Sequence, residues 1–256
     1  MRTVLFLIVF LSFHLSYSQT PKEILKNYEL VWSDDFNGQS IDPLKWGYRY
    51  PGSKRHYGVV TKENTYLDGN GNLVIEVSKK GDSYQIGQIG TEKKFSTKFG
   101  YFECRAKMNK ELGPLMGFWL QSPLIQKVNG SPEINGAEID IFEYQLNGGN
   151  DYILHNIHWN GYGKLHKRVG KKKYINKLSE GYHTFGLKWT KDEYVFYVDG
   201  KQTWRCTEAI SQIPQYIILS AELTGWQGDF KKSKFPDKVI FDYVKVYKEK
   251  ESKKGS

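Results

Sequence analysis

Short runs in which apolar and polar residues alternate, separated by turn residues, recur along most of the chain. The period of two is clearest in residues 101–108, where every second residue is apolar or a cysteine. Residues 194–198 precede Asp199 and Gly200, a pair typical of a type I′ turn, and residues 201–205 return as the partner strand. The pattern therefore predicts strands joined by tight turns.

Further strands are expected at residues 73–77, 183–190, 217–223 and 239–247, and weak helical periodicity is confined to residues 21–26. No repeat and no Pro- or Ser-rich linker divides the chain, and all-β sandwiches often occupy this length as one domain. The expected fold class is an all-β antiparallel sandwich of two sheets.

One expected strand, in residues 136–144, carries three carboxylates within six residues. Successive side chains of a strand alternate between faces, so Glu138 and Asp140 point the same way, whereas strict alternation turns Glu143 away. A β-bulge at residues 141–142 would restore the register and bring Glu143 back. We therefore predict a row of three acids on one face, with apolar neighbours packed into the core behind it.

Two glutamates that flank a smaller acid suit the cleavage of glycosidic bonds, which uses a pair of carboxyl groups around the bond. Two other interpretations fit the same residues: charged side chains on the solvent face of a strand, and a calcium site. Like charges along one face of a strand repel one another, which favours a functional role over a random acidic strand.

Residues 138–143 resemble the active-site signature of glycoside hydrolase family 16, in its bulged form with one extra residue before the last glutamate. That family includes laminarinases, lichenases, agarases, carrageenases and porphyranases. Other elements of the family are similar to residues 31–38, 69–75, 100–108 and 241–247, in the expected order. The resemblance implies a concanavalin-like β-jelly roll whose concave sheet forms a substrate cleft.

The resemblance also implies a role for each acid. Glu138 would be the nucleophile of a retaining double displacement, and Glu143 would be the general acid that later activates water as a base. Asp140 would hydrogen-bond and tune the nucleophile, and its charge would help to keep a neighbour protonated. No cofactor is expected for catalysis.

Aromatic side chains are the expected sugar platforms, because the C–H faces of a pyranose pack against rings. Trp119 lies in a segment similar to the strand that lines the family's cleft, and Trp159 and Trp226 are further candidates. His158 matches the position where the family often carries a histidine near the scissile bond. The alternative is core packing for each tryptophan, and a hydrogen-bonded surface histidine for His158.

Two segments depart from the laminarinase pattern. Residues 113–119 lack the tryptophan that many β-1,3-glucanases carry before the Phe-Trp pair, and residues 221–226 differ from the usual Gly-Gly-rich turn. These departures put laminarin in doubt as the substrate. An anionic or galactan-type polymer fits a basic exported chain somewhat better, and both glucan and galactan stay open.

A structural calcium is a further expectation from the resemblance. Asp242 matches the aspartate of the closing strand that ligates calcium in relatives, with backbone oxygens near Gly71 as partners. A solvent-exposed strand aspartate is the alternative.

Both ends of the chain are expected to lie outside the domain. Residues 1–18 combine a positive start, a short apolar stretch and small residues at a cleavage site, which is typical of a signal peptide. The apolar stretch is too short for a comfortable membrane span, and no cysteine directly follows the cut, which argues against a lipid anchor. We expect a secreted, periplasmic or extracellular protein with one catalytic domain at residues 19–248 and a disordered basic tail at residues 249–256.

The formal net charge of +9 has two local concentrations, at residues 164–173 and 231–238. Anionic polymers such as sulfated polysaccharides are one implied partner, and solubility through lysine-rich loops is the other explanation. Nucleic acid is disfavoured because no motif of that type accompanies the charge. Cys104 and Cys206 are too few for a disulfide scaffold; whether they are bonded stays open, and a buried free thiol is favoured for Cys104.

Together these features and the resemblance predict a monomeric endo-acting β-glycoside hydrolase that cleaves an extended polysaccharide, and the resemblance implies retention of configuration. The substrate would be a β-1,3- or mixed-linkage β-glucan, or a β-galactan such as agar, porphyran or carrageenan. One alternative is a non-catalytic lectin on the same fold, which the joint presence of Glu138, Asp140 and Glu143 disfavours. The other is a transglycosylase, which uses the same residues with a sugar as the acceptor.

Overall fold

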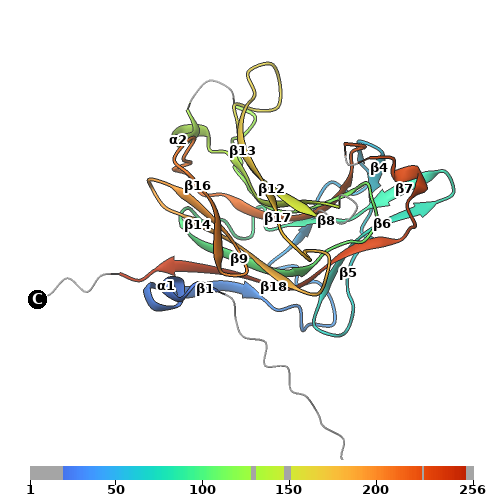
Figure 1. Ribbon diagram of the computed structural model, residues 1–256, viewed down its shortest axis with the longest axis horizontal. Coiled ribbons are helices and arrows are strands. Elements are labelled where there is room, and N and C mark those ends of the chain that lie inside the picture. The colour runs from blue at the N-terminus through green and yellow to red at the C-terminus, as the bar shows by residue number, and fades with distance from the viewer. Residues whose placement is uncertain (1–19, 128–130, 147–150, 227, 252–256) are drawn as a thin grey trace, which may run out of the picture.

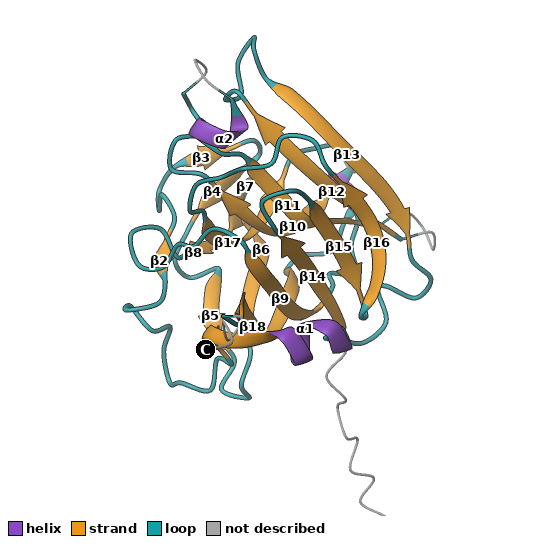
Figure 2. Ribbon diagram, turned by 90° about the vertical axis from the view of Figure 1, so that its left-hand side faces the viewer, coloured by secondary structure: helices purple, strands orange, loops and turns teal. Residues whose placement is uncertain are grey.

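The computed structural model describes residues 20–127, 131–146, 151–226 and 228–251, so the expected signal peptide lies outside the described part. Strands dominate, and two short helices lie at opposite ends of the molecule (Figure 2). These helices are α1 (Lys22–Asn27) and α2 (Pro132–Asn135), and a 3-10 turn, η1, covers Phe230–Lys232. None of the helices within the described residues is long and apolar enough to cross a membrane.

The strands of the described residues form two sheets that pack face to face (Figure 1). The 11-stranded sheet has the order β16 (Lys201–Cys206), β15 (Tyr194–Val198), β14 (His183–Trp189), β9 (Gly100–Lys107), β18 (Asp237–Glu249), β6 (Leu73–Lys80), β7 (Ser83–Ile86), β4 (Gly58–Val60) and β3 (Lys54–Arg55). In addition, β1 (Tyr28–Asp34) pairs with β18, and β5 (Thr65–Leu67) pairs with β6.

The 7-stranded sheet has the order β13 (Lys167–Tyr174), β12 (Tyr152–Trp159), β11 (Glu138–Gln145), β10 (Pro114–Gln121), β17 (Tyr216–Leu223), β8 (Gln88–Gly90) and β2 (Gly47–Tyr48). Its neighbouring strands pair antiparallel, whereas β4 and β7 of the other sheet pair in parallel. The predicted two-sheet β-sandwich is confirmed.

The core lies between the sheets because the strands alternate as the sequence predicts. Phe102 and Cys104 of β9 pack in the same cluster as Phe118 of β10 and Ile139 of β11. Burial of this apolar surface is the dominant stabilising term of such a sandwich. Cys104 is a buried free thiol, as expected, and Cys206 is also unbonded.

The hairpin of β15 and β16 has the predicted turn. Asp199 and Gly200 have φ values of 50° and 70°, and a type I′ turn requires positive φ at both central residues. The predicted basic tail begins too early, however. Glu249 still pairs with Tyr28 in the sheet, and the Lys250 backbone N–H donates to the Asn27 carbonyl over 2.9 Å. Residues 252–256 lie outside the described residues.

Candidate active site

The bulge in β11 lies where the sequence predicts it. In the pairing with β10, Asp140 and Phe142 face consecutive residues, so Ile141 is the extra residue. In the pairing with β12, the register shifts between Asp140 and Glu143. Ile141 and Phe142 are both fully buried in the core, whereas Glu138, Asp140 and Glu143 all line one cavity on the opposite face.

The cavity has a volume of about 940 Å³. It lies over the face of the 7-stranded sheet that points away from the core, and side chains of β10, β11, β12, β13 and β17 contribute to its lining. The segments after β2 and around β3 add a further wall. This volume lies in the range of ordinary ligand clefts.

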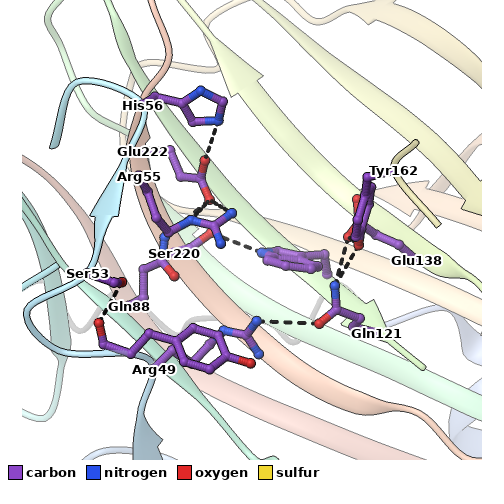
Figure 3. Close-up of polar contacts among 12 residues, drawn as sticks. Arg49, Ser53, Arg55, His56, Gln88, Gln121, Glu138, Tyr162, Ser220 and Glu222 are labelled. Carbon is purple, nitrogen blue, oxygen red and sulfur yellow. Dashed lines mark hydrogen bonds and ion pairs between the residues drawn. The ribbon is translucent and has the colours of Figure 1, made fainter. Parts of the chain in front are cut away.

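Glu138 is held by two donors that meet at one carboxylate oxygen. The side-chain amide of Gln121 donates to its Oε2 over 3.1 Å, and the Tyr162 hydroxyl donates to the same atom (Figure 3). Burial, and then the charge of Asp140, raise the pKa of Glu138 to about 7, although His158 and the two donors oppose the shift. The carboxyl group therefore titrates near neutral pH.

Glu143 is held from the neighbouring strand. The side-chain amide of Asn156 on β12 donates to its Oε2 over 2.5 Å. Burial raises the pKa of Glu143, and the charges of Asp140 and Glu138 raise it further. The shift keeps Glu143 protonated at a pH where an ordinary glutamate is ionised, which a general acid needs.

Asp140 lies between the two glutamates and is 4% exposed. Its Oδ2 lies 3.3 Å from Nε2 of His158 but forms no well-aligned hydrogen bond with any described residue. Burial raises the pKa of Asp140 and lowers that of His158, and Asp140 in its charged form raises the pKa of both glutamates. The ring of His158 is also tied to His166, with 2.8 Å between Nδ1 and Nε2.

Comparison with known proteins assigns the chain to a family. The model of the glycosyl hydrolases family 16 matches residues 53–245, which is most of the chain. The chain belongs to this family. It is a glycoside hydrolase that acts on O-glycosyl bonds, which confirms the resemblance seen in the sequence.

Individual members of family 16 differ in the polymer that their names give. The chain is 28% identical to a keratan-sulfate endo-1,4-beta-galactosidase of Sphingobacterium multivorum, over 87% of this chain but 56% of that protein. It is 27% identical to a beta-glucanase of Rhodothermus marinus, over 87% of this chain and 86% of that protein. The laminarinase catalytic domain of Thermotoga maritima has the same jelly-roll fold, with a TM-score of 0.74 and 27% identity over 88% of this chain and 99% of that domain.

The structure brings three of the four predicted sugar-binding residues to the cleft of this family 16 enzyme. Trp119 lines the cavity and donates from Nε1 to the Ser220 hydroxyl over 2.9 Å. Trp226 also lines it and is 71% exposed, and His158 lies beside the acids. Trp159 points to the other side of β12 and packs against the main core instead.

Several residues of the site were missed in the sequence. Gln121 stands opposite Glu138 and Asn156 opposite Asp140 in the strand registers, so a prediction of strand pairing would have found both. Tyr162 lies in the connection between β12 and β13, and Arg49 follows β2. Loop residues of this kind follow no periodic pattern, and the sequence carries no signal for them.

The expected calcium ligands lie together but are already compensated. Asp242 and Gly71 line one small cavity on the 11-stranded sheet. The Asp242 carboxylate forms an ion pair with Arg105, with 2.6 Å between Oδ2 and Nη1. This cation balances the Asp242 carboxylate, and a calcium ion at this cavity stays a prediction.

Proposed function

We propose that this family 16 enzyme cleaves an extended β-linked polysaccharide at internal bonds by a retaining double displacement. The observation that supports the proposal most directly is the bulged row of Glu138, Asp140 and Glu143 along one wall of the cleft. A sugar-binding protein without catalysis needs no such row, because binding alone does not require like charges to lie side by side.

Glu138 is the proposed nucleophile. The hydrogen bonds that it receives from described residues both end on Oε2, which leaves Oε1 to attack the anomeric carbon. The attack forms a glycosyl ester on Glu138 while the glycosidic C–O bond breaks. Gln121 and Tyr162 hold the carboxylate in place and stabilise its charge before the attack.

Glu143 is the proposed acid and base. Its raised pKa lets it hold a proton, which it gives to the leaving oxygen as the first bond breaks. In the second half of the reaction the resulting carboxylate removes a proton from water, and the hydroxide oxygen displaces Glu138 from the anomeric carbon. Asp140 supports this cycle because its charge raises the pKa of both glutamates.

We also propose where the enzyme acts, in which oligomeric state, with which cofactors and on which polymers. The enzyme is exported, acts as a monomer without a catalytic cofactor, and takes either a β-glucan or a β-galactan. Relatives named for both polymer types support this range. Dialysis against EDTA should leave the hydrolysis rate unchanged.

The test is a reducing-end assay on laminarin, lichenan, agarose, porphyran, carrageenan and keratan sulfate, with Glu138→Gln, Glu143→Gln and wild type in parallel. We expect wild type to release ends from at least one polymer, and each variant to lose about 10³-fold or more in rate. Glu63→Gln, at an exposed position outside the cleft, is the matched control. NMR of the first product should show the β-anomer; an α-anomer would mean inversion, and wild-type turnover by Glu138→Gln would refute the assignment.

The size of the early products separates the remaining alternatives. An endo-acting hydrolase releases oligosaccharides of mixed length from the start, whereas a transglycosylase also makes chains longer than those supplied. Retained binding to one polymer with no release from any of them would favour the lectin alternative.

A further inference from the structure

Arg49 is a buried cation in the wall of the active-site cavity. Arg49 is only 5% exposed, yet its side chain lines the same cavity as the three acids. Its Nη2 donates to Oε1 of Gln121 over 3.4 Å, whereas Nε and Nη1 have no hydrogen-bond acceptor among the described residues. By contrast Arg55, in the same cavity, is balanced by Glu222 at 2.7 Å.

The surrounding residues hold this guanidinium in a fixed place. Its Cζ lies 5.2 Å from the ring of Tyr50, 5.4 Å from Trp119 and 5.6 Å from Tyr216. A glycine at position 90 leaves room for the stem, because a Cβ there would lie 3.3 Å from Arg49 Cδ and 3.1 Å from a backbone oxygen. Three rings and a close-packed backbone therefore build a position for one arginine.

Such a position is costly for the folded enzyme when no anion is bound. Burying a guanidinium without a counter-charge or a full set of acceptors opposes folding, and aromatic rings offset only part of that penalty. An acidic side chain would remove the penalty, but in the described part of the chain none forms an ion pair with Arg49. The unmatched nitrogens therefore favour an acceptor that arrives with the ligand.

We propose that Arg49 is an anion subsite, which binds a sulfate ester or carboxylate carried by a sugar of the substrate. The inference rests on the proposed function and narrows the substrate class to an anionic glycan. A sugar packed on Trp119 presents its substituents to Arg49, because the two side chains touch and line one cavity. A planar guanidinium is suited to such groups, since its donors match two oxygens at once.

The subsite is coupled in space to the reacting bond. Gln121 accepts from Arg49 through Oε1 and donates to Glu138 through Nε2, so it lies between the two residues (Figure 3). The charged sugar would thus lie close to the bond that is cleaved. A different role for Arg49, as a fixed charge that assists Glu138, would affect charged and neutral substrates alike, and the experiment separates these two cases.

The experiment measures binding in a Glu138→Gln background, so that it does not depend on hydrolysis. Affinity electrophoresis at physiological salt compares keratan sulfate, porphyran and carrageenan, each beside its chemically desulfated form, and uses hyaluronan as the carboxylate probe. We expect one sulfated polymer, or hyaluronan in place of them, to bind about tenfold or more tightly than the neutral forms. If the polymer that binds most tightly is sulfated, the bound group is a sulfate ester; if it is hyaluronan, the bound group is a carboxylate.

Substitutions then assign the preference to Arg49. Arg49→Gln should remove the charge-dependent part of binding, and Arg49→Lys should keep a fraction of it, because lysine retains the charge without the planar fork. Arg205→Gln, which removes an exposed arginine outside the cleft, is the matched control and should keep the full preference. Thermal melting checks that each variant is folded.

Three outcomes would overturn the inference. They are equal binding of charged and neutral polymers, a charge preference that persists in Arg49→Gln, and an equal loss of charged and neutral binding in that variant. A failure of the proposed hydrolysis would look different: wild type would release no reducing ends, whatever Arg49 binds.

Discussion

Glu103 on the 11-stranded sheet and Asp140 on the 7-stranded sheet are both buried acids, with exposed fractions of 0% and 4%. Glu103 accepts hydrogen bonds from three hydroxyl groups, those of Thr20 at 2.7 Å, Tyr101 at 2.9 Å and Tyr243 at 2.9 Å. Asp140 has no such set of donors, and its Oδ2 is left without a hydrogen bond from the described residues. The Glu103 carboxylate is therefore surrounded by hydrogen-bond donors, whereas Asp140 has two further acids beside it.

The two regions differ in what opposes the cost of burial. Burial raises the pKa of Glu103, but the three hydroxyls and the charge of Lys245 pull it back. In the cleft, the charge of Asp140 raises the pKa of both glutamates, and the charge of Glu138 raises the pKa of Glu143, in addition to the effect of burial. A buried carboxylate that is surrounded by donors therefore has a structural role. A buried carboxylate that is surrounded by like charges holds a proton that it can transfer.

Of the substitutions that test the difference between these two acids, Asp140→Asn should have the largest effect. Removing the charge lowers the pKa of Glu138 and Glu143, so Glu143 holds its proton less well at neutral pH. We expect kcat/KM at pH 7 to fall about 100-fold and the alkaline limb of the pH–rate profile to move to lower pH. Stability should stay unchanged or rise, because a repulsion has been removed.

The control for this prediction is Asp82→Asn, at an exposed turn between β6 and β7. It removes the same charge away from the cleft and should change neither rate nor stability. A loss of stability in Asp140→Asn that parallels its loss of activity would show that Asp140 is a structural acid like Glu103.

The opposite result is expected for Glu103→Gln. The amide cannot accept from all three hydroxyls, and buried donors without an acceptor cost roughly 1–3 kcal/mol in total stability. Urea unfolding should show this loss, whereas kcat/KM at 25 °C should equal that of wild type. Reduced activity in the folded variant would mean that the two sheets are coupled more tightly than their separate contacts indicate.

How far the sequence determines these two regions depends on the kind of contact. The face alternation and the bulge at residues 141–142 were predictable, because a period of two leaves Glu143 on the wrong side without an extra residue. The surroundings of Glu103 were not, since two of its three donors come from segments 83 and 140 residues away. Tyr162 and Arg49 were missed for the same reason: only the folded register brings their loops to the acids.

The next largest effect should be on the way in which the free energy of unfolding depends on pH. The folded-state pKa of Glu138 is raised from 4.5 to about 7, so the folded protein keeps a proton that the unfolded chain has lost. Its stabilising contribution is complete below pH 4.5 and is lost as the pH rises through 7. Relative to that of wild type, the free energy of unfolding of Glu138→Gln should increase by on the order of 2 kcal/mol between pH 5 and pH 8.

Urea unfolding of both proteins at the two pH values measures this difference. Glu63→Gln, the exposed control, should follow the wild-type curve. Parallel curves for wild type and Glu138→Gln would contradict the raised pKa and would place the cleft acids among ordinary surface carboxylates.

The smallest effect should come from Tyr162→Phe, which removes one donor from Glu138 and so makes the cleft less like the Glu103 site. Because the hydroxyl bond lowers the pKa of Glu138, its loss raises that pKa, and the acidic limb of the pH–rate profile should move to higher pH. We expect a fall in kcat of about threefold to tenfold at pH 6, which shrinks as the pH rises. The matched control is Tyr66→Phe, since the Tyr66 hydroxyl also donates to a glutamate, Glu76, over 3.2 Å but outside the cleft. An equal loss at every pH would show instead that Tyr162 acts by contact with the sugar, because a contact with the substrate does not depend on the protonation of Glu138.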